Sequence, residues 1–427
     1  MTESGVGERK RSHPALGGTV HVIGAGLAGL AAAIALIGRG RRVALSEAGP
    51  AAGGRCRSYF DRELACRIDN GNHLLLAGNR AAMAYLETIG ARASLGGPGR
   101  ALFPFLDLAS GERWVLAPNR GRLPWWMLSR TRRVPGTRAR DYLAIMRLRR
   151  AGPEATVREV LGEGRLVRLL LDPLAIAALN TRPESASARL FAHVLAESLA
   201  EGGAASVPLY PRAGLSETFI DPALAWLRER GAVITFGKRI NALEIEAGRL
   251  AALGTAADKY ALGRADGAIL AVPAPVAQSL LPGLRAPDEF EAILNLHFRI
   301  HAEPGAAGFI GLIGGLAEWV FVKPGIVSVT VSAANHVIDR PAEDLAAEIW
   351  PEVCQALALR GPIPPVRVVK ERRATFQATP AQEQKRPATA CGASNLALAG
   401  DWTATGLPGT IEGAIRSGER AAEYLCA

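Results

Sequence analysis

The sequence predicts an α/β fold in which one largely parallel sheet is assembled from separate stretches of the chain and carries an inserted α+β region. Three observations predict it. A strand, a glycine-rich turn, a helix and a second strand follow one another over residues 19–47. Short apolar runs of strand character return at residues 233–236, 266–273 and 396–400. The stretches between them contain helical and alternating patterns, an order typical of helices packed on a parallel sheet.

The first unit, residues 19–47, combines a buried strand with a glycine-rich turn. Residues 20–23 are rich in β-branched side chains, and apolar residues recur at helical spacing from 27 to 37. Between them, the glycines permit a tight turn, a close approach of the backbone to a pyrophosphate and close packing of helix on strand. Glu47 ends the second strand at the distance expected for a carboxylate that binds ribose hydroxyls. The unit therefore predicts a dinucleotide site formed by Gly24, Gly26, Leu27, Ala28, Gly29, Glu47 and Ala48.

The same stretch has an alternative interpretation. Residues 19–37 contain no Asp, Glu, Lys or Arg and are long enough to span a membrane or to serve as a signal segment. Three interior glycines, the strand-like start and the acid at the right distance argue against it. Residues 1–18 are polar, with basic side chains at 9–11, and predict a disordered tail.

The composition limits the classes of protein that fit. The chain has 427 residues, 49% hydrophobic and 21% charged, which predicts a large core in two or three domain-sized units. Five cysteines without CxxC or metal-like spacing predict packed, reduced thiols, a cytoplasmic protein and no metal site. The net charge of +10 predicts an anionic partner. No motif that reads DNA or RNA appears, so a membrane surface is the better candidate and nucleic acid is not expected.

Two further turns follow the first unit. Paired glycines, Gly53 and Gly54, again bare the backbone, and Arg55 brings a guanidinium to where a phosphate would lie. A polar turn, Asn70-Gly71-Asn72-His73, then leads into an apolar strand.

Four strings together resemble the FAD-dependent amine oxidase and carotenoid desaturase superfamily. They are GAGLAGL at 24–30, AGGRCRS at 52–58, RIDNGNHLLL at 67–76 and AGDWTATGLPGTIEGAIRSGERAAEYL at 399–425. Within this superfamily, residues 55–59 and 69–74 are similar to the hydroxysqualene dehydroxylases of bacterial hopanoid biosynthesis. These enzymes are also described as squalene-associated FAD-dependent desaturases. The resemblance covers nearly all of residues 19–427.

The resemblance implies a GR2-type flavoprotein with bound FAD, in which a discontinuous Rossmann-like FAD-binding domain carries an inserted α+β substrate domain. It implies FAD-binding segments at 19–75, 206–275 and 366–427, and substrate-domain segments at 76–205 and 276–365. It places the backbone of Ile240 at the adenine and adds Val272 to the FAD site. The apolar runs over 290–332 are expected to form an antiparallel sheet, followed by an amphipathic helix over 343–358.

The C-terminal string carries the second part of the expected FAD site. Gly400 and Asp401 follow a strand, so the Asp401 carboxylate can accept from a ribityl hydroxyl. Gly409, Thr410 and Ile411 open a helix whose N-terminus would face the flavin edge where charge accumulates on reduction. A plain capped helix is the alternative, but it does not explain the preceding strand, Gly400 and Asp401.

Residues 120–150 contain ten arginines against one acid, together with Trp125 and Trp126. One interpretation is a membrane patch, with tryptophan at the headgroup level and Arg130, Arg132 and Arg133 toward anionic lipid. The other is a solvated helical face over one aromatic core anchor. The expected location is cytoplasmic, with peripheral contact at the inner face of the membrane under the first interpretation. Residues 120–205 are expected to be mostly helical.

The sequence contains a single dinucleotide fingerprint, so we expect no dedicated NAD(P)H domain and an external electron donor. The resemblance implies reductive removal of the hydroxyl of hydroxysqualene, a lipophilic triterpene, to give squalene. His73 is a candidate for the acid that protonates the departing hydroxyl; alternatively, it only hydrogen-bonds backbone beside the cofactor. Two other functions stay open: a desaturase or amine oxidase of the same fold, and a non-catalytic prenyl-binding escort like the Rab GDP-dissociation inhibitors.

Overall fold

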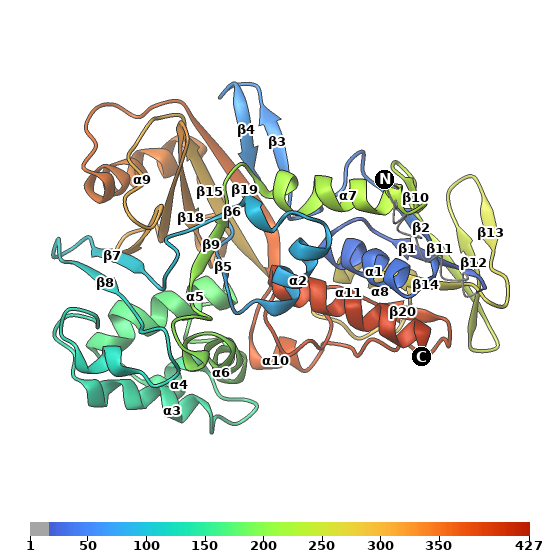
Figure 1. The fold of residues 1–427 in the computed structure, drawn as a ribbon, viewed down its shortest axis with the longest axis horizontal. Coiled ribbons are helices and arrows are strands. Elements are labelled where there is room, and N and C mark those ends of the chain that lie inside the picture. The colour runs from blue at the N-terminus through green and yellow to red at the C-terminus, as the bar shows by residue number, and fades with distance from the viewer. Residues whose placement is uncertain (1–16) are drawn as a thin grey trace, which may run out of the picture.

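The computed structural model describes residues 17–427, so most of the tail expected over residues 1–18 lies outside the described residues. Five parallel strands form the first sheet in the order β10-β2-β1-β14-β20 (Figure 1). Their bounds are β1 Thr19–Ile23, β2 Arg42–Ser46, β10 Val233–Thr235, β14 Gly267–Leu270 and β20 Leu396–Leu398. These strands come from stretches far apart in the chain, which confirms the predicted discontinuous Rossmann-like sheet.

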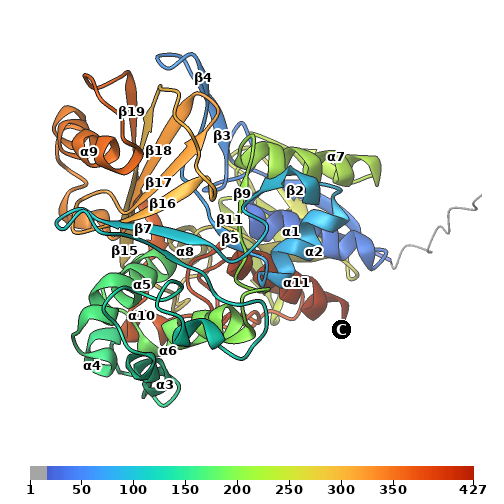
Figure 2. The same ribbon diagram turned by 60° about the vertical axis from the view of Figure 1, so that its left-hand side comes forward.

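Two helices from opposite ends of the chain lie side by side against this sheet, α1 (Leu27–Gly38) and α11 (Ile411–Cys426) (Figures 1 and 2). A Cβ atom placed on Gly418 would come within 2.2 Å of the Ala28 carbonyl oxygen, so the two backbones touch at this glycine. Helices α2 (Arg80–Thr88) and α7 (Asp221–Glu229) pack beside them. The N- and C-terminal segments therefore share one core.

The second sheet has seven strands in the order β19-β15-β18-β17-β16-β7-β8. Strands β15 to β18 pair antiparallel in the order β15-β18-β17-β16, as the sequence predicts for residues 290–332. One face packs under α9 (Ala342–Leu357), which confirms the amphipathic helix expected there. The bounds are β7 Phe103–Asp107, β8 Arg113–Leu116, β15 Phe290–Phe298, β16 Phe309–Ile313, β17 Trp319–Lys323, β18 Ile326–Val331 and β19 Val366–Phe376.

Strand β19 corrects one expected boundary. The expectation that the chain returns to the FAD-binding domain at residue 366 is wrong, because β19 pairs with β15 from Val366 opposite Phe298 to Phe376 opposite Phe290, with one irregularity between them. A short apolar run predicts a strand, but which of two sheets accepts it depends on tertiary packing. The return to the first sheet occurs at β20.

A helical layer covers the other face of the seven-stranded sheet (Figure 2). It contains the helices expected over residues 120–205. Its elements are η2 Trp125–Leu128, η3 Ala139–Leu143, α3 Ala144–Leu148, α4 Val157–Leu161, η4 Val167–Leu171, α5 Asp172–Leu179, α6 Ala188–Glu197 and η5 Leu199–Glu201.

The remaining elements are small. Strands β3 (Ser58–Asp61) and β4 (Cys66–Asp69) form a hairpin, and β11 (Ala242–Glu246) pairs antiparallel with β12 (Arg249–Gly254). The others are β5 Leu75–Leu76, β6 Leu95–Gly96, β9 Pro208–Pro211, β13 Lys259–Ala261, α8 Ala274–Leu280, α10 Pro380–Glu383, η1 Arg92–Ser94, η6 Ser216–Ile220 and η7 Ala334–His336.

Candidate active site

The first glycine turn has room for a phosphate group in front of its backbone. Gly24 adopts a φ of +103°, which a side chain rarely allows, and a Cβ on Gly29 would lie 1.9 Å from the Gly24 carbonyl oxygen. A Cβ on Gly26, in contrast, would meet no atom within 4 Å. No side chain caps the N-terminus of α1, whose first N–H groups have no partner within the helix. This arrangement fits an anionic ligand such as a pyrophosphate.

Glu47 lies against the same turn. One carboxylate oxygen accepts from the Ala25 N–H at 2.8 Å, and the other accepts from the Gly49 N–H at 2.8 Å. The Gly53 N–H donates to the Ala25 carbonyl at 2.8 Å, so the second glycine turn lies beside the first. Ala48 follows Glu47 at the same edge and is half-buried. The end of β2 therefore carries the predicted acid at the mouth of the turn.

The N-terminal and C-terminal motifs meet at Arg55. Its guanidinium donates to the Asp401 carboxylate at 2.5 Å and to the Ala374 carbonyl at 2.7 Å. Asp401 is the main cause of the raised pKa of Arg55. Next to this pair, a Cβ on Gly409 would lie 3.1 Å from the Asp401 carboxylate. Both glycine motifs thus border one site, which fits a ligand that extends from a pyrophosphate to a ring system.

Hydrogen bonds to the side chains of Ser417 and Thr410 stabilise the turn that precedes α11 and the start of this helix. Gly400 has a φ of +148° and its N–H donates to the Ser417 hydroxyl at 2.8 Å. The Thr410 hydroxyl caps α11 by accepting from the Gly413 N–H at 3.1 Å. Ile411 is buried in the core shared with α1.

The other two predicted contacts lie at the first sheet. Ile240 is buried. Val272 lies two residues after the end of β14, and its carbonyl accepts from the Trp402 indole N–H at 2.9 Å.

The Asn70–His73 turn is tied to the seven-stranded sheet. The Asn295 side chain donates to the Asn70 carbonyl and accepts from the Asn72 N–H, both at 3.3 Å. The Asn72 amide donates to the Thr330 hydroxyl at 3.1 Å, while its own oxygen is buried without a partner in the described structure. A Cβ on Gly71 would lie 3.3 Å from the Asn295 amide. This turn is therefore the junction between the two sheets.

His73 lies at the end of that turn. Burial lowers its pKa to about 4; the Asp69 charge raises this pKa by a smaller amount, and the Lys323 and Arg55 charges lower it further. The residue is half-buried. The imidazole is neutral near pH 7, so His73 can pass on a proton only if another group supplies one.

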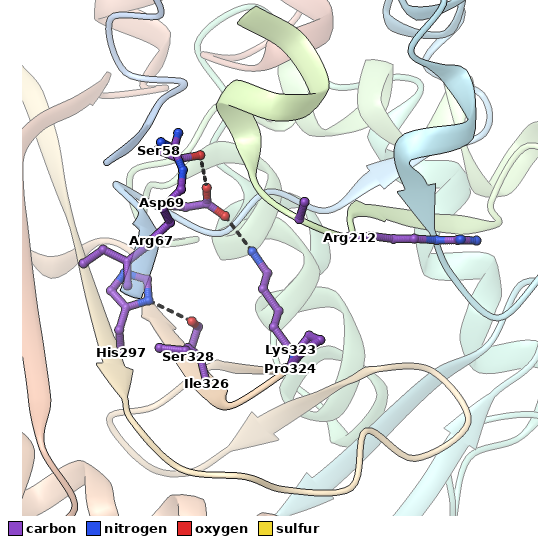
Figure 3. A pocket seen from close by; sticks show the side chains of 11 residues that line it. Ser58, Arg67, Asp69, Arg212, His297, Lys323, Pro324, Ile326 and Ser328 are labelled. Carbon is purple, nitrogen blue, oxygen red and sulfur yellow. Dashed lines mark hydrogen bonds and ion pairs between the residues drawn. The ribbon is translucent and has the colours of Figure 1, made fainter. Parts of the chain in front are cut away.

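A buried charged pair lies beside this turn (Figure 3). The Lys323 ammonium donates to the Asp69 carboxylate at 2.6 Å, and Asp69 also accepts from the Ser58 hydroxyl at 2.6 Å. A cavity of about 180 Å³ adjoins the pair and is also lined by His297 and Ser328. Sequence reasoning missed Lys323 and Asn295. The available signal was a set of isolated polar residues in otherwise apolar strands: Asn295 and His297 in β15, Ser328 and Thr330 in β18.

The arginine-rich segment divides into a buried and an exposed part. Trp126 is only 4% exposed and packs edge-on against Tyr142 at 5.1 Å between ring centroids, so its expected place in a membrane patch is wrong. It is the aromatic core anchor of the alternative interpretation. Trp125, in contrast, is 63% exposed. Exposed with it are the apolar side chains of Leu123, Leu128, Leu143 and Met146 and the arginines Arg130 and Arg132; Arg133 is half-buried and donates to the Met127 carbonyl.

Residues 17–427 contain neither a membrane-spanning helix nor a cluster of metal ligands. The helices there are all too short or too polar to cross a bilayer. No group of three His, Cys, Asp or Glu side chains in that range is arranged to hold a metal ion.

Comparison with known proteins gives consistent matches. The sequence profile of the flavin-containing amine oxidoreductases matches residues 27–302 and 322–426. The chain is 48% identical to hydroxysqualene dehydroxylase of Rhodopseudomonas palustris over 96% of this chain and 98% of the relative. It is 46% identical to hydroxysqualene dehydroxylase of Sinorhizobium fredii over 95% of this chain and 97% of the relative.

Solved structures share the fold at low sequence identity. An oxidoreductase from Methanosarcina mazei superimposes with a TM-score of 0.71 at 14% identity, covering 95% of this chain and all of that one. A double mutant of putrescine oxidase also reaches 0.71, at 15% identity, covering 97% of this chain and all of that one.

Proposed function

The chain belongs to the flavin-containing amine oxidoreductase family and, within it, to the hydroxysqualene dehydroxylases, and on this premise we propose how its residues remove the hydroxyl group of hydroxysqualene to give squalene. It is an FAD-dependent oxidoreductase with a lipophilic triterpene substrate. The observation that carries the proposal is the convergence of both glycine motifs at the Arg55–Asp401 pair.

We infer that FAD is held by backbone groups at one end and charged side chains at the other. Gly26 and the uncapped N-terminus of α1 would bind the pyrophosphate, and Glu47 would bind the ribose. Arg55, Asp401 and the N-terminus of α11 would hold the flavin end. When bound and reduced by an external donor, FAD supplies the hydride that replaces the hydroxyl.

The hydroxylated carbon is allylic, so loss of water leaves a delocalised cation on the substrate that must be shielded from solvent. The face of the seven-stranded sheet turned to the helical layer carries buried aromatic side chains suited to this. Phe309 packs against Trp319 and Phe321 with ring centroids at 6.0 and 5.9 Å. Aromatic faces attract cations, so these rings would favour the charged state as well as excluding water.

The test is a single turnover without oxygen. Enzyme whose FAD has been reduced is mixed with hydroxysqualene, the flavin absorbance is followed, and the product is extracted. We expect flavin reoxidation coupled to one squalene per FAD. Reoxidation without squalene, or formation of a more unsaturated product by the oxidised enzyme, would favour a desaturase; a purified protein that retains no flavin would favour an escort protein.

We also propose that the exposed apolar side chains of residues 123–146 contact an anionic membrane surface, from which the substrate enters. Five of them (Leu123, Trp125, Leu128, Leu143 and Met146) are 53–66% exposed. Nine exposed arginines lie within residues 120–150. This combination of apolar insertion and positive charge suits acidic lipid better than water alone.

Vesicle sedimentation tests the membrane proposal. We expect binding to vesicles containing phosphatidylglycerol that weakens with added salt, because exposed charges are screened. The Trp125→Ser/Leu128→Ser variant should bind less, while Trp226→Ser, at a half-buried tryptophan of α7, serves as the control. Equal binding of neutral and anionic vesicles, or no binding, would contradict the proposal and indicate that this segment is a solvent-exposed face.

A further inference from the structure

Arg386 is a buried cation that contacts the turn carrying Asp401. Its side chain is 0% exposed. The guanidinium donates from Nε to the Thr403 carbonyl at 2.9 Å. From Nη2 it donates to the Asp401 carbonyl at 3.1 Å and to the Thr405 hydroxyl at 2.8 Å, and from Nη1 to the Glu383 carboxylate at 2.6 Å. Three of these four acceptor groups belong to the turn between β20 and α11.

This turn needs donors from outside itself. Asp401 and Thr403 are 4% and 3% exposed and lie outside helix and strand. Gly400, just before them, has a φ of +148°. Buried carbonyls that belong to no helix or sheet must be paired with other groups, because water cannot reach them. Arg386 pairs the carbonyls of both Asp401 and Thr403.

Asp401 is thereby held at two points. Its carboxylate accepts from Arg55, and its carbonyl accepts from Arg386. Both arginines also contact the end of β19. The Arg55 guanidinium donates to the Ala374 carbonyl at 2.7 Å, and the Arg386 guanidinium lies 4.9 Å from the centroid of the Phe376 ring. A displaced turn would therefore lose contacts at both arginines.

Stability alone does not require a charge at this place. Taking a guanidinium out of water is costly, and well-packed apolar side chains often stabilise a protein equally well. What the planar guanidinium provides is a fixed arrangement of donors that meets several acceptors at once, which the point charge of a lysine cannot do. Arg386 is therefore suited to fixing the geometry of the turn.

We propose that Arg386 is a positioning residue of the FAD site. By holding the carbonyls of Asp401 and Thr403, it keeps the Asp401 carboxylate where that group can accept a hydrogen bond from a ribityl hydroxyl of FAD. The inference rests on the proposed function, because it takes the FAD site assigned there. It concerns FAD binding, however, and can be tested without substrate.

The test is titration of the apoprotein with FAD. Arg386→Lys keeps the charge but not the planar set of donors, and we expect its Kd for FAD to rise about 10-fold, as when one charge-assisted hydrogen bond to the cofactor is lost. Arg158→Lys is the matched control, because Arg158 also joins carboxylates, those of Asp172 and Glu184, in the helical layer. Its Kd should stay within twofold of wild type.

A double-mutant cycle separates positioning from a general structural role. In the Asp401→Ala background, Arg386→Lys should change the Kd by less than twofold, because the group through which Arg386 acts is absent. In the Glu47→Ala background the 10-fold effect should persist, because independent sites add. Equal effects in both backgrounds, or a lowered Tm with a wild-type Kd, would overturn the proposal and leave Arg386 a structural residue.

A milder variant keeps the test valid if Arg386→Lys does not fold. Thr405→Val removes one acceptor of the guanidinium and should raise the Kd about 3-fold, the effect of one neutral hydrogen bond, again only while Asp401 is present. An unchanged Kd in this variant would contradict the proposal. A folded wild-type apoprotein that binds no FAD would instead overturn the proposed function.

Discussion

The FAD-binding and substrate-facing halves of the site use different parts of the chain. Around the first sheet, backbone groups at glycines form the proposed binding surface, and Glu47 braces them through the Ala25 and Gly49 N–H groups. Around the seven-stranded sheet, side chains form the surface: Asn295, His297 and Lys323 project from apolar strands. Backbone recognition depends on shape, whereas side-chain recognition depends on burial and charge. Substitutions in the two halves should therefore have different effects on FAD binding and on stability.

The largest expected effect is at Gly26. Gly26→Val should yield a folded protein without FAD, because its side chain enters free space that only the cofactor would fill. Gly29→Val should instead prevent folding, because even a Cβ atom there would lie 1.9 Å from the Gly24 carbonyl. Flavin absorbance and Tm of the two purified variants measure this contrast. Stoichiometric FAD in Gly26→Val would contradict the assignment of the turn.

In the second half, the largest expected effect is on the pH dependence of stability. Burial lowers the pKa of His297 to about 4, below its ordinary value. As pH falls, His297 is therefore protonated at a higher pH in the unfolded chain than in the folded protein. The free energy of unfolding should fall by about 3 kcal/mol in total as pH drops from about 6.5 to 4. Above pH 6.5 this contribution is constant. Urea unfolding of wild type and His297→Gln across this range should show a smaller loss for the variant; parallel curves would contradict it.

The junction between the halves can be weakened at Asn295. Asn295→Leu should lower the free energy of unfolding by about 2–3 kcal/mol, because it leaves the Asn70 carbonyl, the Asn72 N–H and the Thr330 hydroxyl without their partner. Asn241→Leu, at an exposed asparagine, is the control. Chemical denaturation measures both. An Asn295 variant as stable as the control would show that the Asn70–His73 turn does not depend on Asn295 for its stability.

The smallest expected effect is at Glu47. Glu47→Ala should keep the fold and weaken FAD binding about 10-fold, the cost of one lost charge-assisted hydrogen bond. Titration of the apoprotein with FAD measures the affinity. An unchanged Kd would show that the acid serves only to brace the glycine turn.

The backbone-built half was the more predictable one. Residues 19–47 and 399–425 carry their structure in local signals, so glycine spacing and apolar periodicity located β1, α1, β2 and α11. The side-chain half depends on contacts between distant strands. Nothing local distinguishes the partner of β19, the burial of Trp126 or the pairing of Lys323 with Asp69, 254 residues apart.

The contact between α1 and α11 at Gly418 has a consequence for synthesis. Helix α11 is translated after the other described elements, yet its N-terminus is part of the proposed FAD site. While the ribosome still holds this helix, the earlier β-strands can assemble, but the proposed site is incomplete. Under this proposal, flavin loading has to wait until α11 has left the ribosome.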